Sequence, residues 1–199
     1  PAERAWLERH GFEFFAHRLE SRLDLTKLDE GAYRAGIRAA EEAGFAFPSL
    51  EEVIARLGKE AAWERLVPLY QALVQDTPDF AGREMPASAV MARTRHFPFL
   101  HPAATTLVER AGELVGLTFV WRFGEEAYTV MTGISRSARR GGAGYAMKAA
   151  AALRAREAGM QAMGTHNDAS NEKVLALNAR LGYARIGGLW RLHRRYGGA

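Results

Sequence analysis

The sequence predicts an α/β fold of the α+β kind, in which a mixed, mainly antiparallel sheet carries helices on both faces. A strand pattern over residues 127–134 leads through an Arg- and Gly-rich turn into a helical pattern over residues 142–158. Two further strand patterns, 105–110 and 113–123, meet at Ala111-Gly112, which is a hairpin signal. Helical and strand patterns then alternate along the rest of the chain, which favours this fold class.

The composition is that of an ordinary globular protein with room for a sizeable core. Of its 199 residues, 48% are hydrophobic and 25% are charged. The absence of Cys excludes disulfides, thiolate metal sites and a Cys nucleophile, and it is expected of a cytoplasmic protein. We find no run of 18 apolar residues and no signal-peptide pattern, so no membrane partner is expected. The net charge of +4 favours an anionic ligand, but no nucleic-acid-binding module is recognisable.

The first part of the chain repeats a pattern found near its end. Residues 3–9 resemble the end of a helix, Gly11 stops it, and residues 12–25 read as a strand. The segment 178–183 has the same order of helix end, Gly and aromatic residue. We therefore expect an internal repeat, with chance similarity over about a dozen residues as the alternative. The strand is too apolar for a free tail, so it should join a sheet near residues 189–196 or pair with a second copy.

The remaining elements are predicted from periodicity and from Gly and Pro. They are a linker helix over 28–43, a short strand over 45–50, a helix over 61–74 that Pro68 should kink or split, a short helix over 87–95 capped near Ser88, a loop over 97–102, a strand over 160–166, a helix over 170–181, and two final strands, 183–186 and 189–196, divided at Gly187-Gly188.

The turn between residues 135 and 142 has the features of an anion site. The first amides of a helix lack an intrahelical acceptor, and the helix dipole adds positive charge there. Glycines let a phosphate approach the backbone, and arginines supply charge and donors. A solvated basic turn would have the same composition. The chain has no GxxxxGK[ST] motif, and the third Gly of GxGxxG is Met147, so the two common nucleotide loops are excluded.

The motif Arg139-x-x-Gly142-x-Gly144 has a continuation further along the chain. Thr165-x-Asn167-x-x-x-Asn171 follows, and then Leu181-Gly182-Tyr183 closes the next helix. Together these motifs resemble the GCN5-related N-acetyltransferase (GNAT) superfamily over residues 132–183. The resemblance implies the GNAT fold and a transferase that moves an acetyl group from acetyl-CoA to a primary amine of a small molecule or peptide by direct attack.

The resemblance also implies which residues bind coenzyme A. The turn would hold the pyrophosphate through backbone amides, the end of the central strand would pair with the pantetheine arm, and a backbone amide of that strand would polarise the acetyl carbonyl. Asn171 matches a residue that reaches the arm, although it could equally be a helix cap. The full set is Thr132, Gly133, Ile134, Arg136, Arg139, Arg140, Gly141, Gly142, Ala143, Gly144, Asn167, Asn171 and Asn178.

Two departures from the family pattern affect the catalytic residues. Asn178 stands where many members have the tyrosine that protonates the leaving thiolate, and residues 127–134 lack the usual glutamate base. Candidates for this proton chemistry are His96 and His101, with Asp76 and Tyr183 behind them, because His titrates near neutral pH. Both histidines could also be ordinary loop residues. Their separation in the sequence is not a spacing typical of metal ligands, so no metal is predicted.

Two interpretations therefore stay open. The first is an active N-acetyltransferase, and the alternative is a degenerate module that binds coenzyme A and supports a tandem partner domain. Residues 1–43 would be the last strand of a preceding GNAT module plus a linker helix, and residues 44–199 the GNAT domain. The chain, which begins at Pro1, is then expected to be a fragment of a tandem protein resembling mycothiol synthase. Residues 12–25 would make the tandem-domain contact, or a homodimer contact.

Overall fold

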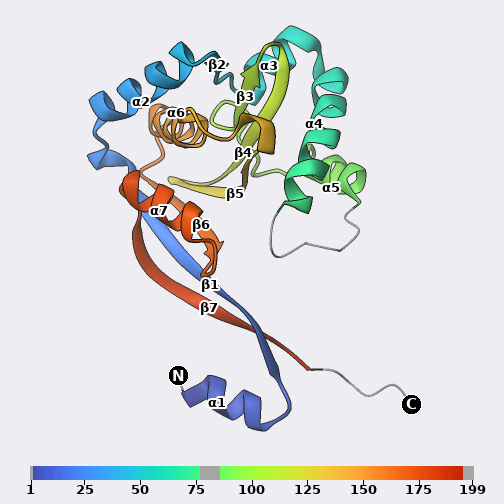
Figure 1. Ribbon diagram of the computed structural model, residues 1–199, viewed down its shortest axis with the longest axis vertical. Helices are drawn as coiled ribbons and strands as arrows, with labels where there is room; N and C mark the ends of the chain where they lie inside the picture. Colours follow the sequence, from blue (N-terminus) through green and yellow to red (C-terminus); the bar gives the residue numbers. More distant parts are fainter. Residues whose placement is uncertain (1, 77–85, 195–199) are drawn as a thin grey trace.

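The computed structural model describes residues 2–76 and 86–194. Seven strands in these ranges form one sheet in the order β2-β3-β4-β5-β6-β1-β7 (Figure 1). Neighbouring strands are antiparallel except β5 and β6, which are parallel. The predicted fold class is confirmed.

The element bounds are as follows. The strands are β1 (Glu13–Asp24), β2 (Phe45–Ala46), β3 (Thr106–Arg110), β4 (Glu113–Phe123), β5 (Glu126–Ile134), β6 (Ala162–Asp168) and β7 (Ala184–His193). The α-helices are α1 (Ala2–Arg9), α2 (Glu30–Glu42), α3 (Leu50–Leu57), α4 (Lys59–Gln75), α5 (Ala87–Thr94), α6 (Ala143–Glu157) and α7 (Glu172–Arg180), and short 3-10 turns are η1 (Leu25–Lys27) and η3 (Arg136–Ala138).

Helices cover the two faces of the sheet differently. Alternate residues of a strand point to opposite faces. Leu107 of β3 packs in a core cluster with α3, α4 and α5, whereas its neighbour Val108 packs with α6. The helices α2, α6 and α7 therefore lie on one face, and α3, α4 and α5 lie on the other, toward the β3–β4 end of the sheet.

Helix α6 is buried on most sides because its side chains are small. Its residues from Ala146 to Leu153 are all buried between α2 and the sheet. Gly36 of α2 makes the contact still closer, since a Cβ there would lie 2.4 Å from the ring of Tyr145. The position of α6 is thus fixed by close packing, which in turn fixes the turn that precedes it.

The first strand occupies an interior place in the sheet. β1 pairs with β6 on one edge and with β7 on the other. Leu23, Leu25 and Tyr33, from β1, η1 and α2, belong to the same core cluster as α6. The prediction that the N-terminal strand joins the sheet beside the last strand is confirmed.

Most predicted elements are present, including the hairpin, the strand–turn–helix unit and the elements that follow it. One helix was missed: α3, whose N-cap residue Ser49 forms a capping box with Glu52. The strand predicted over 45–50 is correspondingly reduced to two residues. The cap predicted near Ser88 is also wrong, because Pro86 is the N-cap residue of α5.

The prediction that Pro68 splits its helix and the prediction that Gly187-Gly188 divides two strands are wrong for identifiable reasons. Pro68 does not split α4; it lies on the exposed side of the helix, where water can bond the carbonyl that a proline leaves free. Gly187 and Gly188 do not divide two strands but lie inside β7. A Cβ at Gly188 would lie 2.7 Å from the carbonyl oxygen of Arg18, so this glycine permits a close approach of β1.

No helix in the described part of the chain is long and apolar enough to cross a lipid bilayer.

Candidate active site

The two parallel strands in the sheet separate before they end. β5 and β6 pair from Glu126 with Ala162 up to Thr129 with Thr165. Beyond that last pair, β5 continues along β4 alone and β6 continues along β1 alone. Residues 130–134 therefore have a backbone edge that no strand of the described chain covers.

The other edge of β5 carries a bulge at the same level. The pairing passes from Val120 with Thr129 directly to Thr118 with Thr132. Val130 and Met131 together thus lie opposite the single residue between Thr118 and Val120. A bulge leaves a residue out of the ladder, so the backbone groups at the separation point are candidates for binding a ligand.

The turn between β5 and α6 has an unusual backbone. Arg140, Gly141 and Gly142 all have positive φ, at 84°, 75° and 80°. Gly142 is the N-cap of α6 and offers no side chain to the first amides of the helix. Because these amides have no intrahelical acceptor, an anion can take their place as the cap.

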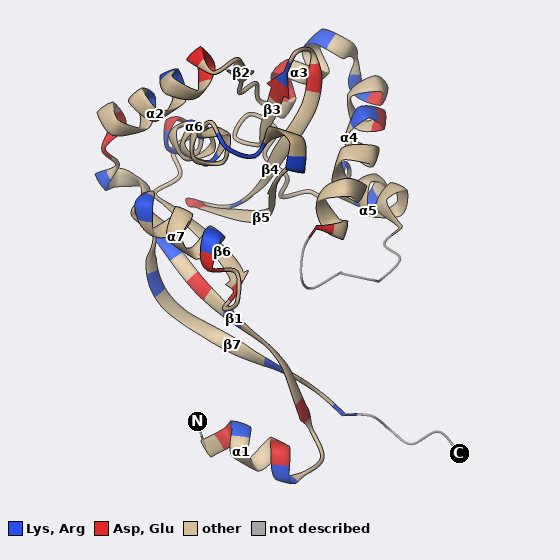
Figure 2. Cartoon of the chain, viewed as in Figure 1, with Lys and Arg blue, Asp and Glu red and all other residues tan. Residues whose placement is uncertain are grey.

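Two arginines of this turn share one carboxylate. Arg136 Nε lies 2.8 Å from Asp76 Oδ1, and an Arg139 guanidinium nitrogen lies 2.7 Å from Asp76 Oδ2. The hydrogen bond from Arg136, with the charge of Arg139 beside it, lowers the pKa of Asp76 below its ordinary value. Basic residues gather at this turn (Figure 2), and Asp76 holds two of them in place at the end of α4.

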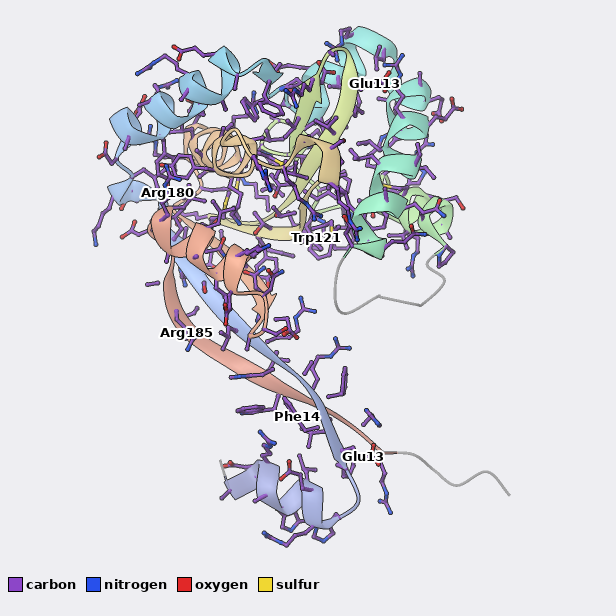
Figure 3. All side chains as sticks on the ribbon, viewed as in Figure 1. Glu13, Phe14, Glu113, Trp121, Arg180 and Arg185 are labelled. Atoms are coloured by element: carbon purple, nitrogen blue, oxygen red, sulfur yellow. The ribbon has the colours of Figure 1, made fainter. Side chains whose placement is uncertain are left out.

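An aromatic pocket lies beside the bulge, on the face that carries α4 and α5. Its volume is about 440 Å³. Trp121, labelled in Figure 3, packs against Phe97 with ring centroids 4.2 Å apart. The lining residues are Tyr70, Val90, Arg93, Thr94, Phe97, Phe119, Trp121, Val130 and Met131. The pocket thus offers a largely apolar surface with one guanidinium.

A second, more polar pocket of about 250 Å³ adjoins the separated strands. His166 of β6 lines it, half-buried, with its Nε2 3.7 Å from a carboxylate oxygen of Glu20. Tyr128 lies beside it, with ring centroids 5.6 Å apart. Val130 lines both pockets, so a histidine–carboxylate pair lies close to the aromatic pocket, at the point where β5 and β6 separate.

Comparison with known families agrees with this geometry. A family model described as an acetyltransferase (GNAT) domain matches residues 31–165, which is more than half of the chain. This protein belongs to the GNAT acetyltransferase family.

Solved structures similar to this member of the GNAT family share its fold at low sequence identity. A GCN5-related N-acetyltransferase from Sphaerobacter thermophilus matches with a TM-score of 0.68 and 15% identity over 98% of this chain and 56% of its own. One from Kribbella flavida has a TM-score of 0.62 and 16% identity over 99% and 65%. A tandem GNAT protein from the clavulanic acid biosynthesis pathway has a TM-score of 0.59 and 17% identity over 96% and 57%.

The chain therefore spans between about half and two thirds of the length of these three proteins. No curated protein sequence matches it.

Of the three asparagines that the sequence singles out, Asn178 near the end of α7 contacts Asn167 of β6, and Asn171 lies at the start of α7. Asn178 donates to the side-chain oxygen of Asn167 over 2.7 Å. Asn171 caps α7, with its side-chain oxygen 3.4 Å from the amide of Val174, so its cap role is confirmed. The side-chain oxygen of Asn178 is buried and has no partner among the described residues, which makes it a candidate acceptor for a ligand amide.

A lysine is buried in α6. Lys148 is 2% exposed, and its ammonium lies 4.9 Å from the ring centroid of Tyr183. Burial lowers the pKa of Lys148 to about 8, and burial raises the pKa of Tyr183. The hydroxyl of Tyr183 has no hydrogen-bond partner in the described structure.

The candidate acids and bases from the sequence do not line either of the two pockets. His96 is exposed after α5, and His101 is half-buried, with Nδ1 accepting from the amide of Ala104 over 3.2 Å. Burial and the charge of Arg122 lower the pKa of His101. Asp76 is bonded to two arginines, and Tyr183 is buried beneath α6. Their catalytic roles stay predictions that this geometry does not favour.

The sequence reasoning missed His166, although it lies within the Thr165–Asn167 motif. Strand alternation could have found it, since Thr165 and Asn167 on one face imply His166 on the other. Among the described residues, no group of three or more His, Asp or Glu side chains could hold a metal ion.

Proposed function

We propose that this acetyltransferase moves the acetyl group of acetyl-CoA to the primary amine of a small molecule with an apolar, aromatic body. The observation that carries the proposal is the separation of β5 from β6 after Thr129 and Thr165. It leaves a free backbone edge between an anion-binding turn and an aromatic pocket. A transfer between two substrates needs such an open edge, because both substrates must reach the same strand, each from its own side.

The residues present fit coenzyme A. The uncapped amides at the start of α6 and the side chains of Arg136 and Arg139 suit its phosphates. Gly133 and Ile134 offer backbone groups to its amide-containing arm, and the unpartnered oxygen of Asn178 can accept from an arm amide. When bound, acetyl-CoA supplies the acetyl group as a thioester.

His166 is the group we assign to proton removal from the acceptor amine. A carboxylate oxygen of Glu20 lies 3.7 Å from Nε2, which is beyond hydrogen-bond distance, so Glu20 acts on the ring through its charge. The carboxylate of Glu20 carries the charge opposite to that of an imidazolium, so the two side chains attract each other once the histidine has accepted the proton. His166 supplies the base that the central strand lacks, from the neighbouring strand β6.

The aromatic pocket is the observation that selects the acceptor. Four aromatic residues line it, and Arg93 is its charged side chain. Such a wall favours an aromatic or aliphatic body over a polyamine, whose extra charges would lose hydration beside apolar rings.

The test measures thiol release from acetyl-CoA with primary amines of different bodies. We expect 2-phenylethylamine and tryptamine to exceed ethanolamine and 1,4-diaminobutane in kcat/KM by about tenfold or more. Phe97→Ala should reduce turnover of the aromatic amines by about tenfold, which corresponds to about 1.4 kcal/mol. Phe123→Ala is the matched control, because Phe123 belongs to the same aromatic group but does not line the pocket.

Two outcomes would contradict the proposal in different ways. Equal turnover of aromatic and polar amines would show that this pocket does not select the acceptor. Binding of coenzyme A in calorimetry without turnover of any amine would favour the alternative, a binding module that supports a partner domain.

A further inference from the structure

The turn that follows α1 repeats the hydrogen-bond pattern of the turn that follows α7. At the end of α1, the amides of Gly11 and Phe12 donate to the carbonyls of Glu8 and Leu7 over 3.1 Å each. At the end of α7, the amides of Gly182 and Tyr183 donate to the carbonyls of Ala179 and Asn178 over 2.9 and 3.0 Å. Gly11 and Gly182 have nearly the same positive φ, 81° and 85°. The predicted internal repeat is therefore present in the backbone.

The pairing of β1 with β7 is symmetric under the same alignment. Aligning Gly11 with Gly182 and counting along both strands places Glu13 on Ala184, Arg18 on Leu189 and Arg22 on His193. Replacing each residue by its counterpart turns the pair Glu13–His193 into the pair Ala184–Arg22, and the sheet contains both pairs. The pair Arg18–Leu189 becomes itself, so the two strands are related by a local two-fold axis at this pair.

Even the irregularities of the two strands obey this symmetry. The register shifts once between Phe14 and Ala16, where Phe15 is the extra residue of β1. It shifts again between Glu20 and Ser21, where Ile186 is the extra residue of β7. Phe15 and Ile186 are counterparts in the alignment. Two matching bulges at matching positions are difficult to attribute to chance, because bulges are specific features of a fold.

The symmetry is broken by what surrounds the two segments. Leu177 of α7 packs against the core, and a Cβ at Gly144 of α6 would lie 3.7 Å from it. Its counterpart Trp6 is 51% exposed, and α1 buries no residue. The ribbon of β1 and β7 extends away from the body with α1 at its far end, and Phe14 projects from the ribbon (Figures 1 and 3). A two-stranded ribbon with exposed apolar side chains is not stable by itself.

We propose that α1 and β1 are the last helix and last strand of a second acetyltransferase module, which precedes α1 in the same polypeptide. The local two-fold axis gives its place: its counterpart of β6 pairs with the outer edge of β7 near Leu189–His193, as β6 pairs with β1 near Arg18. Its counterpart of α6 covers Trp6. The two modules thus exchange their last strands and share one continuous sheet.

A second copy of this chain does not fit that place. The edge of β6 that would have to pair with β7 is already occupied by β1 in every copy. The similar structures support a preceding module, since the tandem GNAT protein matches 96% of this chain, yet the match covers 57% of its own length. The proposal concerns the family fold and does not depend on the acceptor or on catalytic activity.

The experiment uses single cysteines, because the chain contains none of its own. Trp6→Cys is placed both in residues 1–199 and in the complete polypeptide that the gene encodes, and its labelling by a thiol reagent is timed. We expect labelling to be about 100-fold slower in the complete polypeptide. Ala5→Cys is the control on the same helix, because its counterpart Ala176 is exposed on α7, and its rate should be the same in both.

Leu7→Cys is the second variant if the loss of Trp6 weakens folding, since its counterpart Asn178 is 2% exposed. A gene without a preceding module, or equal labelling of position 6 in both proteins, would overturn the proposal. Protection of position 6 in residues 1–199 that appears only as the chain dimerises would also overturn it, because a second copy would then cover α1.

Discussion

Removing the buried lysine of α6 should change how stability depends on pH. Burial lowers the pKa of Lys148 from 10.5 to about 8 in the folded protein. Below pH 8 the folded state carries a buried ammonium without a carboxylate partner in the described structure. Between about pH 8 and 10.5 the folded lysine is neutral while the unfolded chain still binds the proton, so the free energy of unfolding rises with pH.

The size of this effect follows from the two pKa values. One pH unit of difference is worth about 1.4 kcal/mol, so the interval from about 8 to 10.5 corresponds to about 3 kcal/mol. Lys148→Met has a similar shape and no proton to lose. The stability of the parent minus that of Lys148→Met should therefore increase by about 3 kcal/mol from pH 7 to pH 10.5 and should level off above it.

Urea unfolding at intervals of half a pH unit measures this difference, and titrations common to both proteins cancel. Lys173→Met, which removes an exposed lysine from α7, is the matched control, and its difference from the parent should stay level. Parallel curves for the parent and Lys148→Met would refute the reasoning, because they would mean that the ammonium reaches water or a partner in the folded state.

Three further changes test the site and the core. Gly142→Asp should weaken coenzyme A binding by more than about 100-fold in calorimetry, since a carboxylate would cap α6 in place of a phosphate; Gly159→Asp, at the other end of the same helix, should leave binding unchanged, and an unaltered affinity for the first variant would contradict the site. His166→Gln should lower kcat by about 10²- to 10⁴-fold, while coenzyme A affinity stays the same; an unchanged kcat would assign the base elsewhere. Gly36→Ala should destabilise the protein by about 1–3 kcal/mol in thermal unfolding despite the better helix propensity of Ala, because its Cβ would overlap the ring of Tyr145; a rise in stability would mean that this ring moves aside freely.

The fold was predictable where local patterns agree with tertiary structure. The turn Ala111-Gly112, the Gly-rich start of α6 and the Gly182 stop of α7 each fix a backbone conformation locally, and the elements around them were placed to within about two residues. The prediction failed where pairing with a distant part of the chain determines the local conformation. Gly187 and Gly188 look like a turn in isolation, but β1 holds them in a strand.

The side of the candidate site that we propose for the cofactor was predictable from the sequence, and the side that we propose for the acceptor was not. The turn before α6 is contiguous in sequence, so a motif describes it. Asp76, by contrast, meets Arg136 from a distant helix, and Glu20 meets His166 across two strands. The two members of such a pair lie far apart in the sequence, so no motif of fixed spacing contains both. Period-two alternation around Thr165 was the one signal that could have placed His166 on the acceptor face.

The interior position of β1 has a consequence for how the protein is made. β1 is synthesised before the other strands, yet it lies between β6 and β7, the last two strands in the chain. Arg22 pairs with Gly164 on one side and Ala184 on the other, so its partners emerge from the ribosome long after Arg22 itself. Such long-range pairing slows folding, and the apolar strand β1 stays unpaired and exposed until its partners have been synthesised. Expression of this domain should therefore depend on chaperones that shield β1 until its two neighbours arrive.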